Sequence, residues 1–464
     1  MSTPFDDVQR IVLCSSRWQE SRQLVLGFGK RQSPQRFLQL LREAHCWPAC
    51  AGGSKPEVQA SLGFSRRGLE SAHVPKHVLA LFALKAPAYY AGAALRAHRY
   101  LGVSGRNGPG AWDPAFSFMA LDAVLSLHGM EGNVLDKRVK CIRELARGCD
   151  VQVQQLPAAR RLKPPPGETN DLKASWVHFG YRDGLSQIGV EGWTPPQRLS
   201  APKPVSPNAA GEFVLGHPQG GGANPWIAGP GTKVWPEELR NFFHNGSFGV
   251  LNQVEQDAEA FELFVNAKPL GLEPRNLKGK LCGRYTDGNS LGATQHAPEN
   301  DFDYSQDDKG YGCPFGAHAR RMNPRNDSLP HATRPRPLLR RGMPYGQPLW
   351  ASASPPSEER GLIGQFFCAS IEDQFELLVG QWADRVPLGS ADRGSARDPL
   401  IGAHEPGDGG FEIPQGAGKP PLLLEGLLPF TRTAGVAYLF YPSVSVLEKL
   451  VRSCLWHAPD RDDQ

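Results

Sequence analysis

The order of strand-like and helix-like segments in the first 155 residues limits the fold more than any other feature. Segments typical of strands occupy residues 23–28, 58–64, 118–127 and 150–154. Apolar residues recur at helical spacing after the N-cap residue Ser33, at Phe37, Leu38, Leu40 and Leu41, and again over residues 134–146. The resulting order of strand, helix, strand, strand, helix, strand is that of a ferredoxin-like unit.

A second cycle of the same kind follows later in the chain. Strand-like and helical stretches alternate at residues 247–256, 258–265, 361–371, 371–382, 436–441 and 444–451. A proline-rich breaker at 156–173 separates the two cycles. We therefore predict an α+β protein with an N-terminal domain at 1–156 and a C-terminal domain at 157–464. Long Gly- and Pro-rich loops are expected at 196–232 and 386–421, where loops of that length are usually functional.

Composition excludes several classes of protein. Lys and Arg number 51 against 47 Asp and Glu, so the balanced charge argues against a nucleic-acid partner. No apolar run reaches 18 residues, so we expect no membrane partner, and the first residues show no export signal. The nine scattered cysteines contain no C-x-x-C and indicate reduced thiols, hence a cytoplasmic location. The oligomeric state stays open.

The segment 312–325 contains one histidine, His318, beside a concentration of arginines. Seven arginines and no lysine lie between Arg320 and Arg341, which favours recognition of carboxylates or phosphates by planar, bidentate donors. A lone histidine beside such a cluster indicates one axial bond to a haem iron and cationic contacts to its propionates. Three alternatives remain: a structural histidine bonded to the backbone, a nucleic-acid patch, and Cys313 as a thiolate ligand.

Three further segments carry candidate residues. Asp183 lies in Gly180-Tyr181-Arg182-Asp183-Gly184, a weak pattern that also fits a simple type I turn. Arg340 and Arg341 end an apolar strand, where charge could equally cap a strand edge. Residues 360–376 are expected to be mostly core, and their aromatic residues Phe366 and Phe367 would suit the wall of a porphyrin pocket.

Taken in this order, the four segments resemble the dye-decolourising peroxidases. Residues 313–325 match the family pattern C-P-F-x-A-H-x-R-x-x-N-P-R, and the Asp183 and Arg340 segments match its other motifs. The resemblance implies two ferredoxin-like domains in a dimeric α+β barrel-like arrangement, with one heme b in the C-terminal domain. His318 would then be the axial iron ligand. Asp183 and Arg340 would lie on the opposite side of the ring, Arg325 and more weakly Arg320 would contact the propionates, and Phe366 and Phe367 would line the pocket.

The resemblance also implies an activity. The chain would use hydrogen peroxide to oxidise organic reducing substrates such as dyes or phenolics through an oxyferryl intermediate, with an acid-shifted optimum. The alternative is a haem-binding or haem-delivery protein with incidental peroxidase activity. Tyr345 or Trp350 would relay electrons, unless they are ordinary core or rim aromatics. Four acidic residues are open as hydrogen-bond partners of His318: Glu372, Asp373, Glu376 and Asp384.

Overall fold

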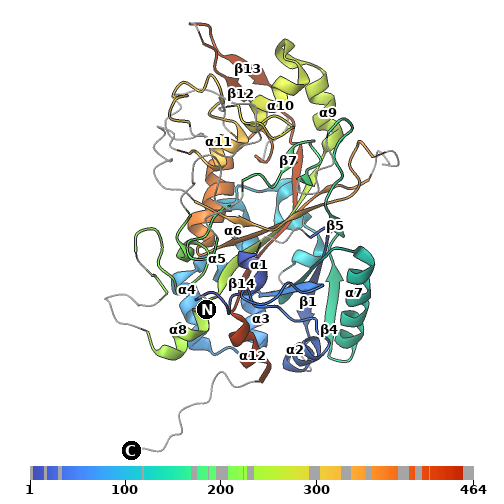
Figure 1. Ribbon diagram of the computed structural model, residues 1–464, viewed down its shortest axis with the longest axis vertical. Helices are drawn as coiled ribbons and strands as arrows, with labels where there is room; N and C mark the ends of the chain where they lie inside the picture. Colours follow the sequence, from blue (N-terminus) through green and yellow to red (C-terminus); the bar gives the residue numbers. More distant parts are fainter. Residues whose placement is uncertain are drawn as a thin grey trace, which may run out of the picture.

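Ten strands, contributed by two halves of the chain, form one antiparallel sheet that closes into a barrel through the pairing of β10 with β11 (Figure 1). The computed structural model describes residues 4–14, 18–29, 34–117, 120–168, 175–186, 188–194, 207–222, 224–226, 235–291, 304–325, 336–351, 358–384, 397–402, 410–416 and 418–452. Ser33 and residues 118–119, which the predicted elements include, lie outside this set.

The N-terminal half has the strand order of a ferredoxin-like sheet. Its strands are β1 (Glu20–Phe28), β2 (Gln59–Phe64), β3 (Ala123–Gly129) and β4 (Val151–Gln155), arranged β4-β1-β3-β2. Helices α2 (Pro34–Glu43) and α7 (Gly132–Arg147) lie on the outer side of this half in Figure 1. Their buried residues Phe37, Leu38, Leu41, Leu135 and Ile142 follow the helical period of the sequence, which explains why both helices were predictable.

Four helices are inserted between β2 and β3: α3 (Arg66–Ser71), α4 (Lys76–Lys85), α5 (Pro87–Ala91) and α6 (Ala93–Tyr100). Three short 3₁₀ turns follow them: η1 (Gly105–Asn107), η2 (Pro109–Ala111) and η3 (Pro114–Phe116). The insertion leaves the half-sheet it interrupts and contacts the C-terminal half, where α6 packs on both β14 and η9.

The C-terminal half repeats the strand order. Its strands are β8 (Ser247–Gln256), β9 (Leu339–Arg340), β10 (Met343–Tyr345), β11 (Gly361–Cys368) and β14 (Thr431–Tyr441), arranged β14-β8-β11-β9 with β10 also on β11. Helices α9 (Ala258–Asn266), α10 (Pro274–Cys282) and α11 (His318–Met322) lie between β8 and β9 in the chain, and α12 (Val444–Arg452) follows β14. Helix η9 (Ile371–Ala383), which has the wider turns of a π-helix, connects β11 to the last third of the half. The predicted α+β fold of two ferredoxin-like units is confirmed.

Short pairings join the two halves. β14 meets β2 at Phe440 and Phe64, and β5 (Ala159–Arg160) pairs with both β1 and β10. β5 lies inside the stretch predicted as a linker, so part of that linker is a strand of the barrel. The predicted domain boundary at 156/157 falls just before β5, and the two halves share one hydrogen-bonded sheet.

The remaining described elements are not strands of the barrel wall: α1 (Arg10–Leu13), α8 (Glu237–Phe243), η5 (Ala210–Glu212), η7 (Pro269–Gly271), β6 (Ser175–Trp176) with β7 (Arg182–Asp183), and β12 (Gly410–Ile413) with β13 (Leu422–Glu425). The predicted loop at 386–421 therefore contains a strand, β12. A second apolar core of α9, α10, β12 and β13, including Phe261, Phe411 and Phe430, forms the upper part of the view in Figure 1.

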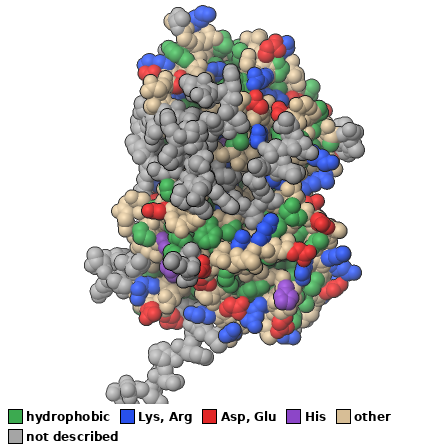
Figure 2. All heavy atoms as spheres, viewed as in Figure 1, with side chains coloured by type: hydrophobic (Ala, Val, Ile, Leu, Met, Phe, Trp, Pro, Cys, Tyr) green, Lys and Arg blue, Asp and Glu red, His purple; other side chains and the backbone are tan. Residues whose placement is uncertain are grey.

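The surface has a mixed charge. Figure 2 shows Lys and Arg interspersed with Asp and Glu over the lower half of the visible face. Among the described residues, no helix is long and apolar enough to cross a membrane.

Candidate active site

His318 is the first residue of α11, and its side chain pairs with a buried carboxylate. Its Nδ1 lies 2.9 Å from Oδ2 of Asp398, a residue with no exposed surface. A carboxylate can only accept, so this contact places the proton of a neutral imidazole on Nδ1 and leaves the lone pair on Nε2. The imidazole is therefore held in the tautomer that can bind a metal through Nε2.

Asp398 is held in the ionised form by its surroundings. Burial raises the pKa of Asp398, but His318, Arg321 and the backbone N–H of Leu400 outweigh burial, and the net pKa lies below the usual value. Oδ1 accepts hydrogen bonds from the N–H groups of Leu400 and Ile401 at 2.9 and 3.1 Å. The carboxylate is thus fully hydrogen-bonded and fixed in orientation before any ligand binds.

None of the four acidic residues predicted as partners of His318 takes that role. Glu376 binds Arg96 and Tyr438, Glu372 accepts from the N–H of Ala88, and Asp373 accepts from Ser370. The predicted set was drawn from the helix expected after the strand at 361–371 and from its end, whereas Asp398 lies 80 residues beyond His318 in the sequence. The sequence around Asp398 has no periodic pattern that could have identified it, since it lies inside the stretch predicted as a loop at 386–421.

Helix η9 connects the His318 side of the site to the strand that carries Arg340. It packs against α11 and against β11, where Phe375 of η9 lies 5.3 Å from the ring of Phe366. Gln374 of η9 donates to the carbonyl of Pro337, 2.6 Å away and just before β9. One helix therefore sets the relative positions of α11, β9 and β11.

Asp183 and Arg340 come from different elements and are tied through one short loop. Asp183 is in β7, and Arg340 ends β9, paired with Phe366 of β11. Nη2 of Arg340 donates to the carbonyl of Ser186, three residues after Asp183, at 3.3 Å. Both side chains are exposed rather than packed in the protein. Arg340 therefore contacts the loop that follows Asp183, and the joint role of the two side chains stays a prediction.

The two predicted propionate contacts differ in their surroundings. Arg320 is buried, with its guanidinium stacked on Tyr304 and Phe315 and bonded to Asp307 and the carbonyl of Cys313. Arg325 is half-buried and has a positive φ of 42°, and its carbonyl accepts from the N–H of Tyr304. Arg320 thus stabilises the loop before α11 through contacts within the protein, whereas Arg325 lies after the end of that helix.

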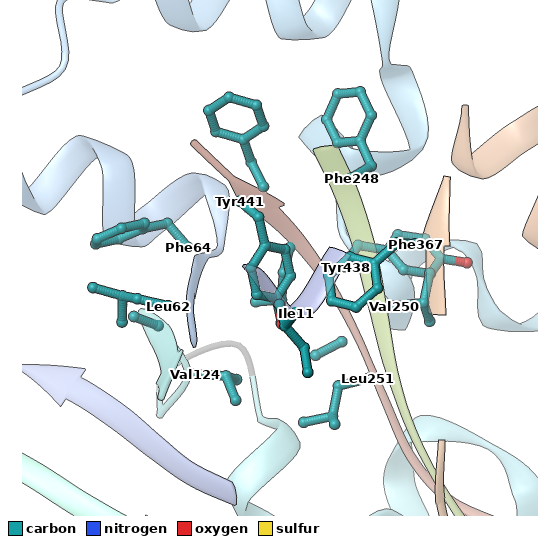
Figure 3. Close-up of a cluster of buried hydrophobic side chains, with 14 of the residues drawn as sticks. Ile11, Leu62, Phe64, Val124, Phe248, Val250, Leu251, Phe367, Tyr438 and Tyr441 are labelled. Atoms are coloured by element: carbon teal, nitrogen blue, oxygen red, sulfur yellow. The ribbon is translucent and has the colours of Figure 1, made fainter. Parts of the chain in front are cut away.

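Phe366 and Phe367 lie on opposite faces of β11, because successive side chains of a strand alternate. Phe366 is in register with Arg340. Phe367 is fully buried and packs on Tyr441, with 4.9 Å between ring centroids, as Figure 3 shows among the buried cluster. Only Phe366 shares a face with Arg340.

Three other predicted residues occupy the protein interior or its edge. Cys313 is buried, and burial raises the pKa of its thiol to about 12, so it is a small apolar side chain rather than a thiolate. Tyr345 is buried in β10, and its carbonyl contacts Nε2 of His178 at 2.7 Å. Trp350 is partly buried and donates to the carbonyl of Lys163.

These features define a closed α+β barrel of two ferredoxin-like halves, with a histidine–aspartate pair at the start of α11 and with Arg340 bonded to the loop that follows Asp183. No protein-family model matches the chain. A dye-decolorizing peroxidase of Mycetinis scorodonius is 25% identical over 444 residues, covering 86% of this chain and 78% of the relative. A multifunctional dye peroxidase of Amycolatopsis sp. is 29% identical over 309 residues, covering 59% and 60% respectively.

Solved structures agree on the fold. The crystal structure of a fungal DyP-type peroxidase from Auricularia auricula-judae superposes with a TM-score of 0.75 at 21% identity, covering 97% of this chain and 100% of the other. A DyP-type peroxidase of Anabaena sp. gives a TM-score of 0.75 at 22% identity, with 96% and 94% covered. The chain is a homologue of the dye-decolourising peroxidases and shares their fold.

Proposed function

We propose that this chain is a haem peroxidase that uses hydrogen peroxide to oxidise organic substrates such as dyes or phenolics. The observation that carries the proposal is the hydrogen bond between Nδ1 of His318 and the buried Asp398. A histidine whose outer nitrogen donates to a carboxylate is a typical metal ligand with increased basicity. The names of the relatives give the same reaction class.

The residues present fit one heme b per chain. One imidazole supplies one ligand, which suits an iron whose in-plane ligands belong to a porphyrin. His318 would bind that iron through Nε2, Arg325 would hold a propionate, and Phe366 would line the pocket. Arg320 and Phe367 leave the proposed set, because the first is already bonded to Asp307 and the second faces the other side of β11.

Asp183 would move the proton of the peroxide. Bound haem would supply the iron centre at which peroxide binds and is reduced. A carboxylate near the inner peroxide oxygen can accept its proton as general base and return it to the outer oxygen as general acid, so that water leaves. The exposed position of Asp183 in β7 leaves its oxygens available for that transfer.

Arg340 would stabilise the negative charge that develops when the oxygen–oxygen bond breaks. A fixed guanidinium does this without reorganising at the moment of reaction. The backbone pairing of Arg340 with Phe366 and its bond to the Ser186 carbonyl hold it in place. The acid-shifted optimum stays a prediction.

A cytoplasmic location is part of the proposal. All eight cysteines that the structure describes are free thiols, including the buried Cys313 and Cys368. Free thiols are the usual state in a reducing compartment.

The absorption spectrum of the haem-loaded protein, before and after one equivalent of peroxide, tests this function. We expect a Soret band that is lost in His318→Ala. Asp183→Asn and Arg340→Leu should keep the band and slow the peroxide reaction by about 100-fold or more. Asp308→Asn, at an exposed pair with Lys309, is the matched control and should react like the parent.

The same experiment distinguishes the peroxidase from the alternative function. A Soret band that does not change with peroxide would favour a haem-binding or haem-delivery protein. If Asp183→Asn and Arg340→Leu both reacted at the parent rate, the assigned proton transfer would be wrong.

A further inference from the structure

The inside of the barrel is lined by polar side chains on its N-terminal wall. Register places Ser21, His128 and Gln59 in one row across β1, β3 and β2, and Gln23, Ser126 and Ser61 in the next row. The opposite face of these strands carries Arg22, which binds Asp136 of α7, and therefore faces the covering helix. The polar rows consequently point to the barrel interior.

The C-terminal wall adds further polar groups. Gln253, Gln365 and Tyr441 belong to the same face as Phe367, and Gln365 donates to the Tyr441 hydroxyl at 3.1 Å. A Cβ atom placed on Gly63 of β2 would lie 2.6 Å from the Tyr441 ring, so this ring spans the two walls. Figure 3 shows the apolar part of the interior, with Ile11 of α1, Val124 and Leu251 near Tyr441.

Many polar atoms on these walls have no hydrogen-bond partner in the protein. They are Gln23 Oε1, Gln59 Nε2, Ser61 Oγ, Ser126 Oγ, both ring nitrogens of His128, Gln253 Oε1 and Gln365 Oε1. All seven side chains are more than nine-tenths buried. His128 lies near the backbone of Arg341 but outside hydrogen-bonding geometry. One unsatisfied buried group lowers the equilibrium constant for folding about fivefold to a hundredfold. Eight such groups together would cost about as much as the whole stability of a typical domain, or more.

The unpartnered groups define the chemistry of what binds them. Hydroxyls, amides and a neutral imidazole both donate and accept, and none of these seven side chains carries a charge, since burial lowers the pKa of His128 to about 4. The nearby guanidinium of Arg341 already donates to the carbonyls of Ile11, Val12 and Arg340. The complement is a small neutral molecule with both donors and acceptors, not an anion.

We propose that the barrel interior is a binding site for a cluster of internal water molecules that bridges the β1-β3-β2 wall to the β8-β11-β14 wall. This site is distinct from the proposed catalytic site, because Arg340 and Phe366 project from the other face of the same sheet. Each water would satisfy two to four of the groups named above.

Two serine variants separate a hydrated interior from a dry one. In a dry core, Ser61→Ala and Ser126→Ala each remove an unsatisfied hydroxyl. Each should then raise the equilibrium constant for folding about fivefold or more. In a hydrated core, each removes an anchor for water and gives no increase. Ser247→Ala is the matched control, because the buried Ser247 hydroxyl donates to the Phe213 carbonyl at 2.8 Å and its loss destabilises in both cases.

Long-lived internal water is measured directly by magnetic relaxation dispersion of oxygen-17 water on the full-length protein. We expect a dispersion whose amplitude falls in the double variant Ser61→Ala/Ser126→Ala and is retained in Ser247→Ala. An unchanged amplitude, or a double variant that is fivefold or more stabilised, would overturn the proposal. Should the double variant not fold, a high-resolution crystal structure of the parent decides: ordered water bonded to Ser126 and Gln365 supports the site, and none there refutes it.

Discussion

Replacing His128 with glutamine should remove much of the acid sensitivity of this fold. His128 is fully buried in the barrel, and burial, with the nearby charge of Arg341, lowers its pKa to about 4 from an ordinary 6.5. Between those two pH values the unfolded chain binds a proton that the folded chain does not. The unfolding free energy therefore falls as the pH falls from 6.5 to 4, and His128 has no such effect above pH 6.5.

The size of the effect follows from the shift. Each pKa unit corresponds to about 1.4 kcal/mol, so His128 should account for about 3 kcal/mol lost between pH 6.5 and 4. His178, buried against the Tyr345 carbonyl with a pKa also lowered to about 4, adds a second contribution of the same sign. Burial raises the pKa of Glu372, which acts in the opposite direction, so the comparison of variants is more informative than the total slope.

Urea unfolding at several pH values between 7 and 4.5, with haem loading held equal, measures how the unfolding free energy of the parent and of His128→Gln depends on pH. His128→Gln should lose stability with acid less steeply than the parent, by about 1.4 kcal/mol per pH unit below pH 6.5. The exposed His98→Gln serves as the control and should follow the parent. Equal slopes for the parent and His128→Gln would refute the reasoning, whatever their stability at pH 7.

Three further changes have expected outcomes. Arg96→Ala should lower the unfolding free energy by about 3 kcal/mol or more, because Glu376 would keep its buried charge without its bidentate partner. Gly380→Ala should destabilise the protein although alanine favours helices, because the added Cβ would lie 1.6 Å from the Tyr100 carbonyl oxygen. Thermal unfolding measures the stability of both variants. Asp398→Asn should weaken haem binding about 10- to 100-fold, measured by haem transfer to an acceptor globin.

Controls for these variants come from the same chain. Lys268→Ala breaks an exposed ion pair with Glu273 and should cost less than about 1 kcal/mol. Gly221→Ala places its Cβ in open space. Asp308→Asn should retain haem like the parent. A fully stable Arg96→Ala or Gly380→Ala, or an Asp398→Asn with parent haem affinity, would contradict the contacts described above.

The helices and strands predicted most accurately from the sequence are those whose pattern of apolar residues reflects one dominant packing contact. Helix α7 was predicted over 134–146 and spans Gly132–Arg147, because its apolar stripe faces a sheet. The strand predicted at 247–256 is β8 with the same bounds, since both of its faces are buried. By contrast, β3 begins at Ala123 rather than 118, and β5 was hidden in a proline-rich stretch because a two-residue strand has no period to detect.

The sequence by itself determined the two ferredoxin-like cycles, the position of His318 beside an arginine cluster, and the order of the Asp183, His318 and Arg340 segments, because each depends on local spacing. Only the tertiary structure decided what depends on approach in space. It brought Asp398 to His318 although four other acidic candidates are nearer in the sequence, and it placed Phe366 and Phe367 on opposite faces of β11. It also closed the sheet around buried polar groups that have no hydrogen-bond partner in the protein. The pattern of a segment reports whether a side chain is buried, but not which distant residue it is buried against.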